Sequence, residues 1–268
     1  MPRTEAVATP RPLTPAPSGP SIGPVRALLV CLLVLAPAGA ASAQSPLVAE
    51  LRAVETRYHE DPTRLDRLYQ GLTEALKTDS HLDNFLALAQ ISYMWGDVRA
   101  RTPEEKLEAY DRGRQAAKRA VELAPRSALA HFWHATNAGR WGQTKGVLRS
   151  LFLLPTVKEG MRNALELDPK LTGAYSLAGN VYAEVPGLFG GDLDKSEEMF
   201  RKGLELDPKY TGCRVGLAKT LVKKNRLDEA RRELRAVLDE KQPRNLADWT
   251  LKDSKQAREL LDSLKDRS

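Results

Sequence analysis

A short phrase that occurs three times limits the possible folds of this chain more than any other feature. The phrase runs from Ala120 to Pro125, from Ala164 to Pro169 and from Gly203 to Pro208. Each copy holds a small residue, an apolar residue, Glu-Leu, one further residue and then proline, which has no backbone N–H and ends a helix. A helix end that recurs in this way predicts a series of similar helical units.

After residue 44 the apolar residues follow helical spacing, and β-branched runs with a period of two are absent. One helical hairpin cannot bury its apolar face alone, so neighbouring hairpins stack to complete a core. We therefore predict an all-α fold: an α-solenoid of four stacked antiparallel hairpins, preceded by a partial pair at about residues 45–58 and 62–77. A helix at about residues 246–265 is expected to cap the array. Its expected apolar side consists of Leu246, Trp249, Leu260, Leu261 and Leu264.

The spacing within each hairpin resembles the tetratricopeptide repeat, whose first (A) helix carries Leu-Gly/Ala and an aromatic residue. Its second (B) helix carries alanine, an aromatic residue, alanine and then proline. Gly179 stands where this pattern requires two helices to approach closely. The residues that fit the pattern are Phe85, Leu88, Ala89, Trp95 and Gly96, then His131, His134, Ala135, Trp141 and Gly142, then Leu217, Ala218, Leu221, Ala230, Leu234, Val237 and Pro243.

Extra residues separate the A and B helices of the first three hairpins, and two of these insertions are apolar. Loops are normally polar, so apolar insertions must pack against something. They either fold back over the edge of the array or line a pocket or partner surface. The residues concerned are Leu148, Leu151 and Phe152 in one insertion and Leu188 and Phe189 in the other. Asp192, which follows two glycines, is expected to cap the next helix.

With these insertions the chain resembles two narrower families. One is the T-component family, which accompanies the periplasmic substrate-binding proteins of TRAP transporters, and the other is the family of regulators of microtubule dynamics. The resemblance covers Lys106 to Pro125, His131 to Gly142 and Gly179 to Leu217. Neither family brings a catalytic signature, and the first implies an accessory of solute uptake that contacts a periplasmic substrate-binding protein.

The N-terminal segment has the pattern of an export signal. Seven prolines in residues 1–24 precede Arg26, the apolar run Ala27 to Ala36 and the triplet Ala41-Ser42-Ala43. A positive flank, a short apolar run and an A-x-A site are typical of a secretory signal peptide, which predicts cleavage after Ala43 and a periplasmic mature chain, residues 44–268. A membrane anchor fits less well because a spanning helix needs about 20 apolar residues. A lipoprotein signal at Cys31 fits poorly because Val30 is not small.

Charge and cysteine content exclude some classes of protein. The chain carries a net charge of +6, of which three arginines and one glutamate in the leader account for +2. Acids and bases alternate along the rest, as on solvated helix faces, so no nucleic-acid binding is predicted. Cys213 is the single cysteine after the leader, which excludes an intramolecular disulfide there.

No catalytic motif occurs in the sequence, so no enzyme activity and no cofactor are predicted. His131 and His134 stand three residues apart on one helix, but no acid lies at helical spacing from them. Both fall on repeat positions that pack between helices, so packing is favoured over a metal site. Cys213 has no neighbouring histidine and is expected to be a small core residue.

The concave face of the array is the predicted binding surface. A helices line that face, and two hypotheses follow: a scaffold that binds a protein or peptide partner there, or a component that binds a small apolar ligand or lipid through the inserted turns. Arg140, Lys219 and Lys223 would favour an acidic peptide. The predicted groove residues are Gln90, Tyr93, Thr136, Arg140, Asn180, Lys219 and Lys223. Oligomeric state is not predicted.

Overall fold

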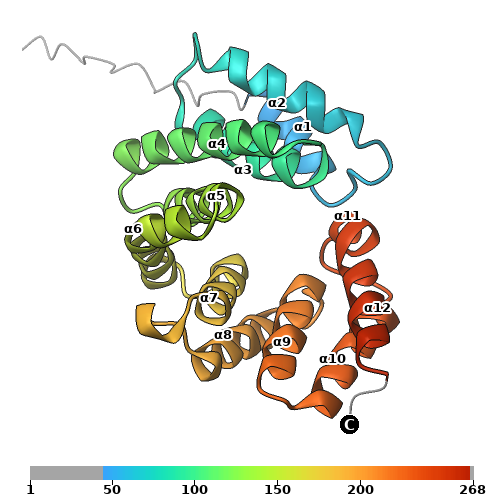
Figure 1. The fold of residues 1–268 in the computed structure, drawn as a ribbon. Helices are drawn as coiled ribbons and strands as arrows, with labels where there is room; N and C mark the ends of the chain where they lie inside the picture. The colour runs from blue at the N-terminus through green and yellow to red at the C-terminus, as the bar shows by residue number, and fades with distance from the viewer. Residues whose placement is uncertain (1–44, 266–268) are drawn as a thin grey trace, which may run out of the picture. The chain divides into compact units, whose positions relative to one another are not determined.

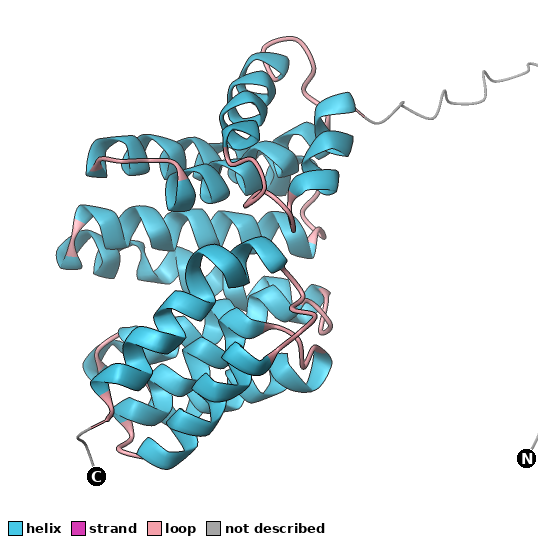
Figure 2. Ribbon diagram, turned by 90° about the vertical axis from the view of Figure 1, so that its right-hand side faces the viewer, coloured by secondary structure: helices cyan, strands magenta, loops and turns pink. Residues whose placement is uncertain are grey.

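The computed structural model describes residues 45–265. The predicted signal peptide and its cleavage site lie outside the described residues. No strand occurs within residues 45–265 (Figure 2). The helices are α1 (Pro46–Val54), α2 (Thr63–Ala75), α3 (Leu82–Val98), α4 (Pro103–Leu123), α5 (Ala128–Lys145), α6 (Val147–Leu167), α7 (Thr172–Glu184), the 3₁₀ turn η1 (Gly187–Phe189), α8 (Leu193–Leu206), α9 (Thr211–Lys223), α10 (Leu227–Asp239), α11 (Leu246–Asp248), the π-helical turn η2 (Trp249–Asp253) and α12 (Ser254–Ser263).

The predicted solenoid of helical hairpins is confirmed (Figure 1). The four predicted hairpins are α3–α4, α5–α6, α7–α8 and α9–α10, and α1–α2 form the N-terminal pair. Each copy of the recurring phrase ends a B helix, because α4, α6 and α8 stop two residues before Pro125, Pro169 and Pro208. In the described part of the chain, no helix is both long and apolar enough to cross a membrane.

The expectation of enlarged A–B turns is wrong for the first two hairpins, because the extra residues lengthen helices instead. Thr102 and Glu105 form a reciprocal cap that starts α4 early. Only Gly146, at φ 111°, separates α5 from α6, so the apolar segment after it is the first part of α6. The third insertion is a true loop, η1, and Asp192 caps α8 as predicted by accepting from Lys195 N at 3.0 Å.

Close approach of small residues holds the C-terminal half together. Phe200 of α8 is fully buried. A Cβ at Gly179 would lie 2.7 Å from its ring, and one at Gly216 would lie 2.4 Å from it, so α7 and α9 can approach α8 only without side chains there. The predicted close approach at Gly179 is therefore confirmed. Cys213 is buried in the same cluster, which raises the pKa of its thiol to about 12 and leaves it unreactive.

The C-terminal helix caps the array as predicted and also contacts its beginning. Trp249 Nε1 donates to Val237 O of α10 at 2.7 Å, which covers the last hairpin. Leu246, however, is 40% exposed and does not belong to the apolar side. Its neighbour Ala247 is buried among the side chains of α1 to α3, and Ala247 N donates to Thr56 O at 2.9 Å. The two ends of the helical array therefore meet.

Candidate functional site

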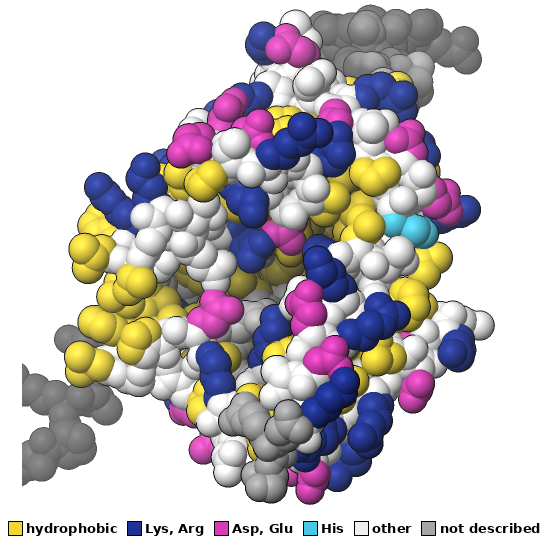
Figure 3. Space-filling model, turned by 45° about the vertical axis from the view of Figure 1, so that its right-hand side comes forward, with side chains coloured by type: hydrophobic (Ala, Val, Ile, Leu, Met, Phe, Trp, Pro, Cys, Tyr) yellow, Lys and Arg dark blue, Asp and Glu magenta, His cyan; other side chains and the backbone are white. Residues whose placement is uncertain are grey.

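A cavity of about 1060 Å³ lies inside the array. The A helices α3, α5, α7 and α9 line it together with the first part of α6, and α1, α11 and η2 complete its wall. Figure 3 looks into a hollow whose rim carries side chains of both charges. The volume is at the upper end of the range for small-ligand pockets. The A helices thus form the inner surface, as the repeat pattern predicts.

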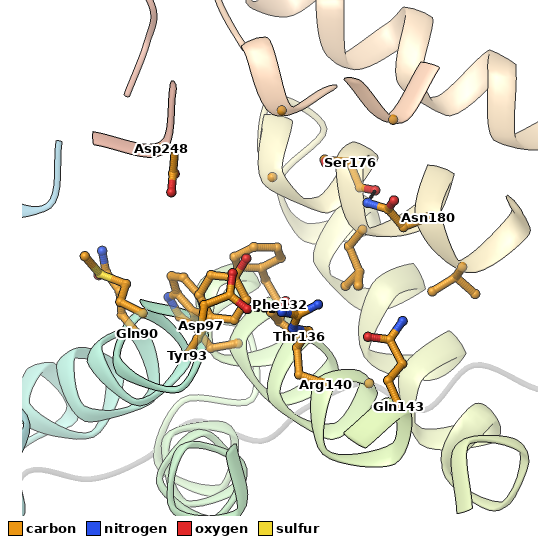
Figure 4. Close-up of a pocket in the computed structure, with 18 of the residues that line it drawn as sticks. Gln90, Tyr93, Asp97, Phe132, Thr136, Arg140, Gln143, Ser176, Asn180 and Asp248 are labelled. Atoms are coloured by element: carbon orange, nitrogen blue, oxygen red, sulfur yellow. Dashed lines mark hydrogen bonds and ion pairs between the residues drawn. The ribbon is translucent and has the colours of Figure 1, made fainter. Parts of the chain in front are cut away.

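The structure brings most of the predicted groove residues together. Gln90, Tyr93, Thr136, Arg140, Asn180 and Lys219 all line the cavity, and Figure 4 shows the first five of them. Lys223 is not part of the wall, and its Nζ donates to Ala183 O at 2.6 Å.

The basic residues of the wall do not form a positive patch. Arg140 pairs with Asp97, and Lys219 Nζ donates to Gln256 Oε1 at 2.6 Å. The same wall also contains carboxylates that the sequence did not single out, among them Asp97, Glu184, Asp248 and Asp253. The cavity is therefore mixed in charge, which removes the ground for expecting an acidic peptide.

A charged cluster joins the two ends of the array beside the cavity. Lys252 of η2 lies 3.3 Å from Asp97 of α3 and 2.6 Å from Asp248 of α11. Asp248 also accepts from the hydroxyl of Tyr58, and Asp97 accepts from the hydroxyl of Tyr110 at 3.2 Å. Burial raises the pKa of both tyrosines, so both remain hydrogen-bond donors. We call these five residues the latch cluster.

Two polar atoms of the wall have no partner within residues 45–265. Thr136 is 8% exposed, and its Oγ1 makes no hydrogen bond there. One helical turn later, Arg140 Nε is also buried and unpaired, although the guanidinium contacts Asp97 through Nη2. Thr136 and Arg140 lie beside each other in Figure 4. Buried polar atoms usually have partners, so a ligand acceptor that reached this pair through a small shift of the wall would gain two donors.

The predicted apolar residues separate into two groups. Leu151 lines the cavity and is half-buried. Leu148, Phe152, Leu188 and Phe189 are 84%, 75%, 90% and 45% exposed. The interpretation that these insertions fold back over the array is therefore wrong for the exposed four, since the array does not cover them.

The histidine pair packs in the structure. His131 Nε2 lies 2.9 Å from Pro125 O, and burial lowers the pKa of His134. Among the described residues, no group of three or more His, Cys, Asp or Glu is placed to hold a metal. Trp95 joins α3 to α2 of the N-terminal pair by donating to Asp66 Oδ1 at 2.7 Å and stacking on Tyr69. The sequence did not predict these two partners.

Asp253, in the cavity wall, makes stability depend on pH. Burial raises its pKa to about 6 from 3.8, with Asp248 adding to the rise, while the hydrogen bond from Thr211 and the charges of Lys252 and Lys219 oppose it. Because the folded pKa is raised, the contribution of Asp253 to stability is complete below pH 3.8 and falls as pH rises through 6.

We expect Asp253→Asn to raise the free energy of unfolding at pH 8 by about 1–2 kcal/mol, part of the roughly 3 kcal/mol that a shift of two pKa units allows. The substitution should change stability little at pH 4. Urea unfolding at both pH values measures this difference. Asp262→Asn, on the exposed face of α12, is the matched control. A gain for Asp253→Asn of equal size at pH 4 and pH 8 would contradict the assignment.

Stacked hairpins whose A helices line a concave inner surface define a tetratricopeptide-repeat protein. Residues 190–252 match the tetratricopeptide repeat directly. Residues 48–188, just over half of the chain, match the family described as regulator of microtubule dynamics protein 1-3. The chain belongs to the regulator of microtubule dynamics family.

Two similar proteins show how far the likeness extends. Regulator of microtubule dynamics protein 1 of Bos taurus is 30% identical over 114 residues, which are 42% of this chain and 36% of the bovine protein. The chain thus aligns with about a third of the length of that relative. A crystal structure of a thermophilic tetratricopeptide-repeat protein from Thermus thermophilus superposes with a TM-score of 0.56 at 21% identity, over 78% of this chain and 95% of that one. That likeness shows the fold.

Proposed function

We propose that this protein is an exported, non-enzymatic scaffold that holds an extended segment of a protein partner in its central cavity. The observation that carries the proposal is the unpartnered pair, Thr136 Oγ1 and Arg140 Nε, in the cavity wall. Repeat arrays of this kind use their concave surfaces for binding. A backbone carbonyl of the partner would accept hydrogen bonds from both atoms once the wall shifts slightly around them.

The surroundings of this pair suit an extended peptide. Tyr93, Phe132 and Trp133 supply aromatic surface, with ring centroids 5.8 Å apart for Tyr93–Trp133 and 4.8 Å apart for Phe132–Trp133. Wall carboxylates and bases together would pair with a segment that carries both charges. Asn180, whose Nδ2 donates to Ser176 O at 2.8 Å, presents a further amide to the cavity.

Export supports a partner in the periplasm. Arg26, the apolar run after it and Ala41-Ser42-Ala43 are the features of a cleaved signal peptide. We propose that the partner is a periplasmic protein, with a substrate-binding protein of solute uptake as the leading candidate. Alkaline phosphatase fused after residue 50 would be active if the leader directs export, and inactive fusions would refute the periplasmic assignment.

Thr136→Val tests the cavity site. Valine keeps the shape of threonine but removes an unpartnered hydroxyl, so the free protein should be as stable as the parent or slightly more stable. Affinity for a peptide selected from a random library should fall about tenfold, the value of one buried hydrogen bond. Isothermal titration calorimetry measures the affinity, and urea unfolding measures the stability.

Thr220→Val is the matched control, because Thr220 is also buried but already donates to Gly216 O at 3.1 Å. This variant should lose stability and keep its peptide affinity. The cavity proposal is wrong if Thr136→Val binds as the parent does, or if both variants lose affinity equally.

A second candidate is the binding of a small apolar ligand. Leu151, Leu154 and Val185 line one end of the cavity, close to the uncovered apolar residues. Native mass spectrometry of the purified protein would show a bound apolar molecule. Its absence, together with an unchanged melting temperature across lipids, would leave the peptide scaffold as the function.

A further inference from the structure

The first part of α6 is apolar on more than one side. Val147, Leu151 and Leu154 face the cavity, whereas Leu148 and Phe152, one helical turn apart, do not line it. No residue from 147 to 156 is buried. A helix that is apolar around its circumference normally lies inside a protein or against an apolar phase. The outer side of this segment therefore needs a cover that the described chain does not supply.

A second exposed apolar element stands beside α6. Lys158 of α6 donates through Nζ to Phe189 O of η1 at 2.8 Å, which fixes the 3₁₀ turn next to the helix. Leu188, the most exposed large apolar residue of the described chain, projects from that turn. We call Leu148, Phe152, Leu188 and Phe189 the apolar tip. Figure 3 shows hydrophobic side chains of this kind standing out from the surface.

Basic residues flank the apolar tip without partners in the described part of the chain. Lys145 and Arg149 are exposed, and neither makes an ion pair or a hydrogen bond there through its side chain. No acid occurs between residues 144 and 158. The other three B helices begin with acids: α4 with Glu104 and Glu105, α8 with Asp194, and α10 with Asp228 and Glu229. Acids stabilise a helix start and a cation does not, so Arg149 in the first turn of α6 costs local stability.

We propose that the apolar tip docks on an anionic lipid surface. Apolar side chains that project from a helix start and an adjacent turn, with cations beside them, match the way in which interfacial helices bind membranes. Lys145 and Arg149 would meet the lipid phosphates, and Leu148, Phe152 and Leu188 would enter the boundary of the acyl chains. A protein partner would instead need acids opposite these cations and a surface shaped around the projecting side chains. This membrane site is separate from the peptide site proposed for the cavity.

A fluorescent label at the tip tests the proposal in the full chain. An environment-sensitive dye is attached to Leu148→Cys in a Cys31→Ser background, where Cys213 is buried and unreactive. Vesicles with about 30% phosphatidylglycerol should shift the emission to the blue, and vesicles of phosphatidylcholine alone should shift it much less, because the cations act only on anionic lipid. The same dye at Leu123→Cys, at the far end of α4, is the control and should not shift.

Charge reversal then isolates the electrostatic part. Lys145→Glu with Arg149→Glu should raise the lipid concentration for half-maximal shift at least about thirty-fold, since each basic residue near an anionic surface contributes about a factor of five. Arg126→Glu with Lys170→Glu makes the same change in net charge on turns at the other end of the hairpins, and should leave the titration nearly unchanged.

Three results would overturn the proposal. The first is a dye at position 148 that responds no more than the dye at position 123, which would show that only the leader reaches the lipid. The second is an equal effect of both charge reversals, which would show a non-specific attraction. The third is a blue shift without vesicles that grows with protein concentration, which would show that the apolar tip is an interface between two copies of this chain.

Discussion

Phe200→Ala is expected to lower the free energy of unfolding by about 3–5 kcal/mol, the range for a buried aromatic residue reduced to alanine. The ring of Phe200 fills the space that Gly179 and Gly216 leave open, and it has no exposed surface. The rigid backbones of α7, α8 and α9 cannot move inward to fill the cavity left behind, because helix packing fixes their distances. The loss should therefore lie toward the upper end of that range.

Chemical denaturation followed by circular dichroism measures this change. Phe152→Ala makes the same substitution at a residue that is 75% exposed, and should change the free energy of unfolding by less than about 0.5 kcal/mol. Equal losses in the two variants would show that the exposed start of α6 packs in solution. A loss below about 1 kcal/mol for Phe200→Ala would show that the three helices collapse around the cavity.

Local signals in the sequence were enough to predict the fold. Each copy of the recurring phrase combines the apolar end of a B helix with a proline, and both act on their own turn of helix, so the pattern fixes where helices stop. Asp192 was predictable for the same reason, because a helix cap depends on one residue and its near neighbours. Gly179 was predictable because the repeat pattern requires two helices to approach closely there. A helices on the inner surface follow from stacking such hairpins.

The lengths of α4 and α6 were harder to predict. Extra residues between repeat positions can lengthen either a helix or a loop. Which of the two forms depends on where helix-capping residues stand. Thr102 and Glu105 lengthen α4, whereas η1 stays a loop because Gly190 adopts φ 89° and Asp192 starts α8 only after it. Insertion length alone does not distinguish these outcomes.

Charges inside the cavity were beyond prediction because they meet across long sequence distances. Asp97 and Lys252 are 155 residues apart, and the pairing exists only because the array curves enough for its ends to touch. The repeat motif predicts that Arg140 faces inward but not that Asp97 pairs with it. The same curvature encloses the cavity, so the binding surface and the latch cluster arise together.

Lys252→Met is expected to release the C-terminal helix from the first hairpin. Without the ammonium group of Lys252, neither Asp97 nor Asp248 has a cation from η2 to pair with. The side chain of Asp97 is only 9% exposed, so water cannot hydrate its carboxylate fully. Opening costs little elsewhere, since α12 keeps its contacts with α10, so the change should be local rather than global. We expect the free energy of opening to fall by about 2–4 kcal/mol, as for other broken, largely buried charge pairs.

Hydrogen exchange at Ala247 N, which donates to Thr56 O, reports on this opening directly. Exchange should speed up about 30- to 1,000-fold in Lys252→Met, the equivalent of 2–4 kcal/mol. Lys255→Met, one helical turn away with a side chain 73% exposed, is the control and should exchange as the parent does. Adding Asp97→Asn to Lys252→Met should restore part of the protection, because it removes a carboxylate that Arg140 alone would then neutralise. Unchanged exchange in Lys252→Met would mean that Ala247 and its apolar neighbours, rather than the charges, hold the two ends of the array together.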